Sequence, residues 1–106
     1  MHSINGYVYG NGPAGTSDAS PAFRSRLGER VRWYTMGMGT EVDLHTPHWH
    51  GQSLTWAGMR TDIAELLPAS MKVLDMVPDN PGTWLYHCHV EGHMAQGMIG
   101  IYRVSH

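Results

Sequence analysis

The stretch HCHVEGHMAQGM, residues 87–98, holds three histidines, a methionine at its end and the only cysteine of the chain. A second stretch, HTPHWHG at residues 45–51, holds three more histidines. Six of the eight histidines and the cysteine therefore lie in two short segments. Imidazole and thiolate groups gathered in this way are typical ligands of transition metals. Because there is one cysteine, no disulfide can form within the chain.

The sequence around these two stretches predicts short strands and little helix. Runs rich in β-branched and aromatic residues are separated by turns that contain glycine and proline. The predicted strands span residues 4–9, 30–36, 41–50, 71–77, 83–89 and 98–104. A loop is predicted over 10–21 and a single helical turn over 62–67, with Thr61 as its N-cap. Many short strands with little helix predict an all-β domain, a sandwich or a barrel.

Length and composition limit the class of protein. With 106 residues we expect a single domain, 1–106. The net charge is −2, which excludes a strong electrostatic attraction to nucleic acid or to an acidic membrane surface. No apolar stretch approaches the ~18 residues of a membrane helix, and no signal peptide is visible.

The alternation of side chains along a strand sorts the ligands into two sets. Successive residues of a strand point to opposite faces, so His87 and His89 share one face and Cys88 points to the other. By the same rule His48 and His50 share a face that His45 does not. The predicted first set is His45, Cys88, His93 and Met98. His93 and Met98 lie beyond the strand, on a loop that is opened by Gly92 and closed at Gly97. The predicted second set is His48, His50, His87 and His89.

The chemistry of the first set indicates an electron-transfer copper site. Two imidazoles, one thiolate and a weak thioether ligand are diagnostic of such a site. The second set, imidazoles alone, suits Cu(II) with open positions for oxygen ligands. A structural zinc site, which also takes Cys and His, explains four ligands but not two sets on opposite faces. Nucleophilic Cys–His catalysis also uses these residue types, but it does not need six imidazoles. The two remaining histidines, His2 and His106, are interpreted as structural or solvent-exposed.

With both motifs, the sequence resembles the copper-bearing cupredoxin domain of a multicopper oxidase. The resemblance rests on HTPHWHG (45–51) and HCHVEGHMAQGM (87–98) and extends to MHSINGYVYGN at the start. A similarity to the last domain of ceruloplasmin-like and two-domain, laccase-like oxidases runs over residues 28–90. This stretch begins with GERVRWYTMGMGTEVDLH (28–45) and ends with PGTWLYHCHV (81–90). The fold implied is an all-β cupredoxin Greek-key β-sandwich.

The resemblance implies a role for each ligand. His45, Cys88, His93 and Met98 match the type 1 copper ligands. His48 matches a type 2 ligand, and the type 3 ligands are matched by His50, His87 and His89. Members of the family oxidise a small reducing substrate at type 1 copper and reduce O₂ to water at a trinuclear type 2/type 3 site.

Two departures from the family pattern shape the expected assembly and substrate. The family's trinuclear site uses eight imidazoles and this chain offers four, so we expect a homo-oligomer, a dimer or higher multiple with copper at the interface, or a partner domain. Ceruloplasmin-like ferroxidases bind iron through a histidine at the His2 position and an acid at the position of Gly92. This sequence has Glu91 one residue earlier instead, so it departs from the iron-binding pattern of these members.

Two other functions fit the same residues. The first is a mononuclear blue-copper electron-transfer protein, with the extra histidines empty or holding a lone type 2 copper at a subunit interface, as in nitrite-reductase-like chemistry. The second is a copper-binding domain without enzymatic activity. In each case the resemblance implies a periplasmic or extracellular location.

Overall fold

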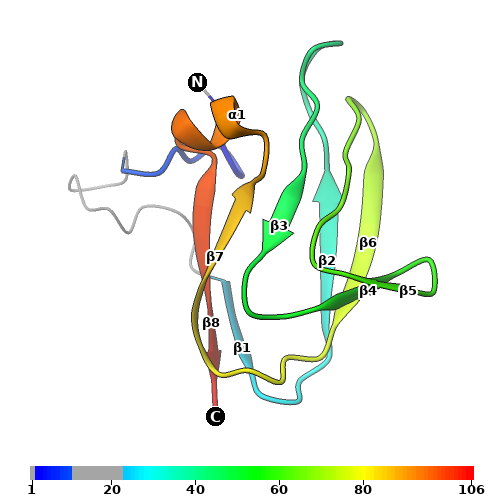
Figure 1. Cartoon of the computed structure of the whole chain (residues 1–106), viewed down its shortest axis with the longest axis vertical. Helices are drawn as coiled ribbons and strands as arrows, with labels where there is room; N and C mark the ends of the chain where they lie inside the picture. Colours follow the sequence, from blue (N-terminus) through cyan, green and yellow to red (C-terminus); the bar gives the residue numbers. More distant parts are fainter. Residues whose placement is uncertain (1, 11–22) are drawn as a thin grey trace.

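Two four-stranded sheets face each other in a computed structural model that describes residues 2–10 and 23–106 (Figure 1). One sheet has the order β1-β8-β7-β3 and the other the order β2-β6-β4-β5. The strands are β1 (Phe23–Arg26), β2 (Val31–Met36), β3 (Pro47–Trp49), β4 (Leu54–Trp56), β5 (Met59–Thr61), β6 (Met71–Met76), β7 (Gly82–Cys88) and β8 (Ile99–Ser105). One short helix, α1 (Glu91–Ala95), joins β7 to β8. The predicted all-β sandwich is confirmed.

The core lies between the two sheets and is rich in aromatic side chains. Trp33 of β2 is at its centre, with ring centroids 4.9 Å from Phe23, 5.4 Å from Tyr86 and 5.6 Å from Trp49. Trp49 and Leu74 are fully buried. Burying such a side chain contributes roughly 1.5–3 kcal/mol, so this cluster fixes the inward faces of β2, β3, β6 and β7.

The four longest strands follow the sequence closely. Those predicted over 30–36, 71–77, 83–89 and 98–104 correspond to β2, β6, β7 and β8. In β2 the alternation of buried and exposed residues is regular after Val31, as expected of a strand with one face on the core. The loop predicted over 10–21 falls, apart from Gly10, outside the described residues.

Three predicted elements are wrong. Residues 4–9 form only an isolated bridge between Ile4 and Tyr7, and only Pro47–Trp49 of the strand predicted over 41–50 is formed. Residues 62–67 are not helical, because their backbone pairs with the ligand-bearing segment instead. The N–H of Leu66 donates to the carbonyl of His45 at 2.7 Å, and the N–H of His45 donates back at 3.0 Å.

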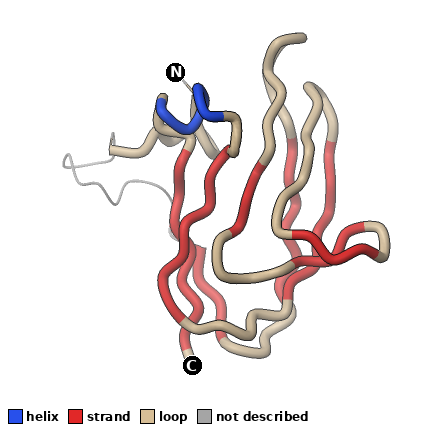
Figure 2. The backbone as a smooth tube through the Cα atoms, in the orientation of Figure 1, coloured by secondary structure: helices blue, strands red, loops and turns tan. Residues whose placement is uncertain are grey.

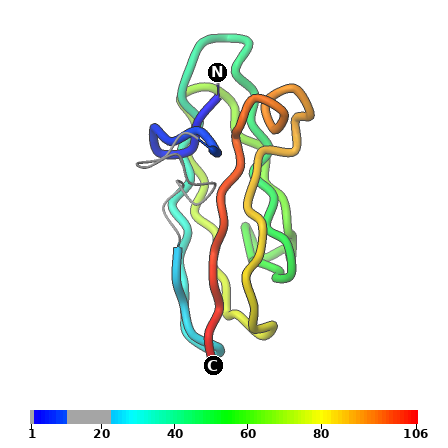
Figure 3. Tube along the Cα trace, turned by 90° about the vertical axis from the view of Figure 1, so that its left-hand side faces the viewer, coloured from blue at the N-terminus to red at the C-terminus, as the bar shows by residue number. Residues whose placement is uncertain are grey.

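The elements that matter for the site meet at one end of the sandwich. Figure 2 shows α1 as the one helical segment among the described residues, directly after β7. In the turned view of Figure 3, the N-terminal segment (blue) lies at the same end as α1 (orange). None of the described helices is long and apolar enough to cross a membrane.

Candidate metal centres

The pairing of β3 with β7 creates two faces that carry different ligands. Pro47 lies opposite Cys88, and His48 lies opposite His87. Directly paired residues point to the same face, so the face of Cys88 and the face of His87 are separated by the strand itself. Trp49, which has the opposite parity to His48, is fully buried in the core. The register therefore places Cys88 and His87 on opposite faces of β7, and the assignment of the two ligand sets to two copper sites stays a prediction.

The first group of donors gathers around Cys88, which is 2% exposed. Its Sγ lies 3.9 Å from Nδ1 of His45 and 3.7 Å from Nδ1 of His93. The donor atoms of these three residues all lie within 4.8 Å of one another. They come from the segment before β3, from the end of β7 and from α1, so three separate elements converge on one point.

The segment after β7 is a helical turn, whereas the sequence predicted a loop. The N–H groups of His93 and Met94 both donate to the carbonyl of Val90 at 3.0 Å. Met98 follows the turn, and its carbonyl accepts the N–H of Cys88 at 3.0 Å. Met98 lines the same cavity as His45 and Cys88, so all four residues of the predicted first set are brought together.

Burial prepares these imidazoles for a metal. Burial, and next the charge of His93, lower the pKa of His45, against smaller opposing effects of a hydrogen bond to the Met38 backbone and of Asp43. Burial is also the main cause that lowers the pKa of His93. Metal ligands must be deprotonated, and both shifts favour the neutral imidazole. The N–H of Thr46 donates to Sγ of Cys88 at 3.4 Å.

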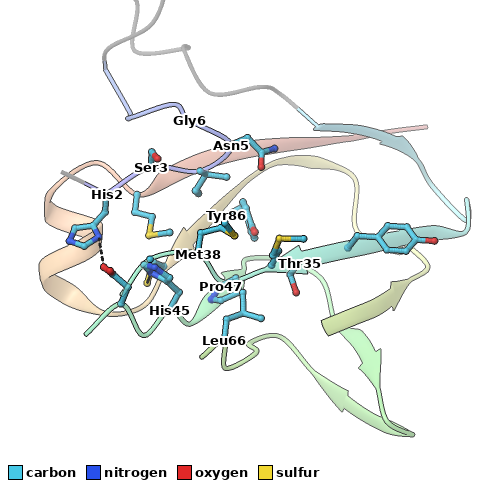
Figure 4. A pocket seen from close by; sticks show the side chains of 17 residues that line it. His2, Ser3, Asn5, Gly6, Thr35, Met38, His45, Pro47, Leu66 and Tyr86 are labelled. Carbon is cyan, nitrogen blue, oxygen red and sulfur yellow. Dashed lines mark hydrogen bonds and ion pairs between the residues drawn. The ribbon is translucent and has the colours of Figure 1, made fainter. Parts of the chain in front are cut away.

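His2 is a neighbour of this group that the residues alone did not reveal. Its ring stacks on that of His93, with centroids 3.8 Å apart and planes 23° apart. Its Nδ1 lies 4.0 Å from Oδ1 of Asp43, as the dashed line in Figure 4 marks. The one signal in the sequence was the family resemblance, which places a histidine of the iron-oxidising members at this position. His106, by contrast, is exposed.

The second group of donors lies on the other face of β7. One ring nitrogen from each of His48, His50 and His87 lies within 4.8 Å of the others, and Nε2 of His50 and Nε2 of His87 are 2.9 Å apart. The ring of His89 is 5.3 Å from that of His48 and 5.6 Å from that of His87. The structure thus brings together the four predicted imidazoles, three of them more tightly than the fourth.

Hydrogen bonds fix the orientation of these rings. Nδ1 of His87 lies 2.9 Å from the carbonyl oxygen of Cys88. A carbonyl oxygen can only accept a hydrogen bond, so Nδ1 carries the proton of the neutral ring. Nε2 is then unprotonated and has a lone pair that can bind a metal. Nε2 of His48 lies 3.4 Å from Oδ2 of Asp62. The hydroxyl of Tyr102 donates to the carbonyl of His50 and anchors that backbone. Burial, followed by the charges of the neighbouring histidines, lowers the pKa of His50.

Both groups have the chemistry of a copper site. Nδ1 of His48 is buried without a hydrogen-bond partner in the described part of the chain, as expected of a nitrogen that a metal would satisfy. The first group offers two imidazoles, a thiolate and a nearby thioether, the donor set of an electron-transfer copper. The second group offers imidazoles only.

The family model described as multicopper oxidase matches residues 2–106. The chain belongs to the multicopper oxidase family. It is 44% identical over 105 residues to hephaestin from Homo sapiens and 41% identical over 107 residues to ceruloplasmin from Rattus norvegicus. These alignments cover 99% and 98% of the chain but 8% and 9% of the relatives, so the chain spans less than a tenth of their length.

Solved structures of multicopper oxidases share the fold. McoA multicopper oxidase from Aquifex aeolicus superposes with a TM-score of 0.79 at 21% identity, over 98% of this chain and 26% of McoA. A multicopper oxidase from Campylobacter jejuni gives 0.73 at 24% identity, over 98% of this chain and 23% of that one. The predicted cupredoxin sandwich is thereby confirmed. Copper is the cofactor of the multicopper oxidase family, and the two groups of donors could bind it.

Proposed function

We propose that this domain is the electron-accepting part of a laccase-like oxidase that is completed by another chain or domain. His45, Cys88, His93 and Met98 would hold a type 1 copper. His48, His50, His87 and His89 would supply half of a type 2/type 3 site. The observation that carries the proposal is the adjacency of His87 and Cys88, which belong to different groups and are consecutive residues of β7.

The residues of this chain would connect the two groups in two ways. The peptide bond between Cys88 and His87 is a covalent path, and the hydrogen bond from Nδ1 of His87 to the carbonyl of Cys88 runs beside it. When bound, copper would supply one-electron oxidation of a small reducing substrate at the first group and reduction of O₂ to water at the second. The fixed tautomer of His87 would keep Nε2 directed to the second group.

A partner is needed because the second group is a half-site. The resemblance calls for eight imidazoles, and this chain offers four. Two copies that face each other through a two-fold axis would supply the full number, since an isologous contact repeats the same surface on both sides. The domains that accompany this segment in longer relatives could serve the same purpose. By the resemblance, we expect the assembly to be periplasmic or extracellular.

Copper content, size and oxygen uptake, measured together, test this proposal. A dimer that shares one cluster would hold about 2.5 coppers per chain. Association should increase with copper, because a metal bound only by the assembly favours the assembly. His48→Ala with His50→Ala should abolish oxygen uptake and keep the blue colour, while His106→Ala, the matched control, should change neither. If a copper-loaded monomer reduces oxygen as fast per chain as any assembly, the proposal fails.

A second candidate function is a mononuclear blue-copper carrier with a lone type 2 copper. The convergence of three imidazoles, rather than four, within 4.8 Å favours this candidate. Copper content separates the two. An assembly that holds a single extra copper per interface, and that does not take up oxygen, would favour the carrier.

A further inference from the structure

Three methionines are exposed together at one end of the pairing between β2 and β6. Met36 is 57% exposed, Met38 67% and Met71 70%. Met36 and Met71 are direct cross-strand partners, so their Cβ atoms lie roughly 4.5–5.5 Å apart on one face. Large apolar side chains gathered on a surface indicate a contact or binding site rather than a contribution to the core.

The backbone holds Met38 beside this pair. The N–H of Gly37 donates to the carbonyl of Ser70, and the N–H of Ala69 donates to the carbonyl of Gly37, both at 2.9 Å. A Cβ at position 37 would press against the backbone carbonyl of Leu67, so glycine permits this close approach. These bonds hold the chain against β6 for one residue past the end of β2, and Met38 follows directly and lines the same cavity as Met36.

A cavity connects two of these methionines, Met36 and Met38, to the first group of metal ligands, and Met71 is linked to it through its pairing with Met36. Met36 and Met38 line a cavity of about 660 Å³ that is also lined by His45, Cys88 and Met98. Figure 4 shows Met38 and His45 among the side chains around it.

We propose that Met36, Met38 and Met71 form a thioether site that captures Cu(I) and passes it through the cavity to Cys88 and His45. Thioethers are soft ligands that select Cu(I), and a thiolate with imidazoles is a stronger donor set for the same ion. The ion would therefore move from the weaker, exposed site to the stronger, buried one without a change of oxidation state. The thioether site lies outside both groups of ligands described above.

Binding can be tested with Ag(I), a soft cation of the same charge that air does not oxidise. The Cys88→Ser variant removes the competing thiolate, and ¹³C-methyl labelling of methionine reports on each thioether by NMR. We expect the methyl resonances of Met36, Met38 and Met71 to shift in step with added Ag(I). Met59, which is 58% exposed on β5, is the internal control and should not shift. Unchanged resonances of the three methionines, or an equal shift of Met59, would overturn the proposal.

Delivery can be tested with Met36→Leu, Met38→Leu and Met71→Leu combined, since leucine has a similar volume and these exposed positions tolerate it. Copper retained after a chelator quench measures loading of the first group when parent and variants all carry His48→Ala with His50→Ala, which removes two ligands of the second group. Loading from a Cu(I)–chelator complex should slow at least about tenfold, and loading from Cu(II) should not change. Met59→Leu should load like the parent protein. Normal Cu(I) loading in the triple variant would refute delivery. This assay consumes no oxygen, so its outcome does not depend on the proposed oxidase activity.

Discussion

At the scale of single residues, Cys88 belongs to the first group and also joins the two groups. It is buried, its Sγ faces His45 and His93, and its carbonyl holds the tautomer of a ligand in the second group. We predict that Cys88→Ser abolishes the blue absorption of the copper-loaded protein, because the band requires a thiolate–copper bond. Absorption spectra before and after copper addition measure this, and circular dichroism should show the fold retained. A blue Cys88→Ser protein would contradict the assignment.

Met98 provides a finer test of the first group. As a weak axial ligand it should be dispensable for copper binding, because His45, Cys88 and His93 supply most of the affinity. We predict that Met98→Leu keeps the copper and raises its reduction potential, since an apolar axial position disfavours Cu(II). Redox titration followed by the blue band measures the change. A Met98 that only fills the cavity would instead give an unchanged potential and a loss of stability below about 1.5 kcal/mol.

At the scale of elements, the sequence predicted the long strands and missed the short ones. Alternation over six or seven residues identifies β2 and β6, whereas β4 and β5 have three residues each, too few for a pattern. Their turn also lacks the usual signal: Ala57 has a φ of 50° and Gly58 a φ of 77°, although alanine rarely takes a left-handed conformation. The contacts of the full fold, and not local preference, select this turn.

Parity alone predicted that Cys88 and His87 point to opposite faces of β7, whereas His93 and Met98 lie beyond that strand, where parity does not apply. Side chains alternate between the two faces of a strand, so consecutive residues such as His87 and Cys88 point to opposite faces in any fold that makes this segment a strand. The positions of His2 and Asp62 were not predictable in this way, because each reaches a ligand from a segment distant in sequence. Asp62 lies next to His48 because residues 62–67 pair with the ligand segment instead of coiling into a helix.

Gly51, which follows the last histidine of the first motif, supports the local structure of β3. Its φ is 73°, and a Cβ there would overlap the indole of Trp84. We predict that Gly51→Ala destabilises the metal-free protein by about 2–4 kcal/mol, from strain and overpacking together. Gly58 is the matched control, because its φ is 77° but the space around it is open, so Gly58→Ala should cost about 1–2 kcal/mol. Urea unfolding measures both, and equal losses would show that the indole contact is unimportant.

At the scale of the whole molecule, three imidazoles that are wholly or partly buried couple stability to pH. The pKa values of His45, His50 and His93 are lowered, mainly by burial, while histidines of the unfolded chain titrate near pH 6.5. Below about pH 6.5 the unfolded state therefore binds more protons than the folded state. We predict that the free energy of unfolding of the metal-free protein falls as the pH drops from about 7.5 to 5.5.

Urea unfolding at several pH values measures this dependence. His50→Gln removes one of the groups with a lowered pKa and should make the slope shallower. A stability that is constant over this range would contradict the prediction. Because copper binds the neutral imidazole, the copper-loaded protein should lose copper over the same range in which the metal-free protein loses stability.

The alternation along β7 also has a consequence for evolution. Substitutions change one ligand at a time, but an insertion or deletion of one residue between Trp84 and Cys88 would rotate every later side chain by half a turn. The sulfur of Cys88 would then point to the face that carries the imidazoles of the second group, and both centres would be lost in one mutational event. Selection should therefore tolerate length variation in the loops of this lineage and purge it from β7, and a library of single-codon insertions should reproduce that boundary.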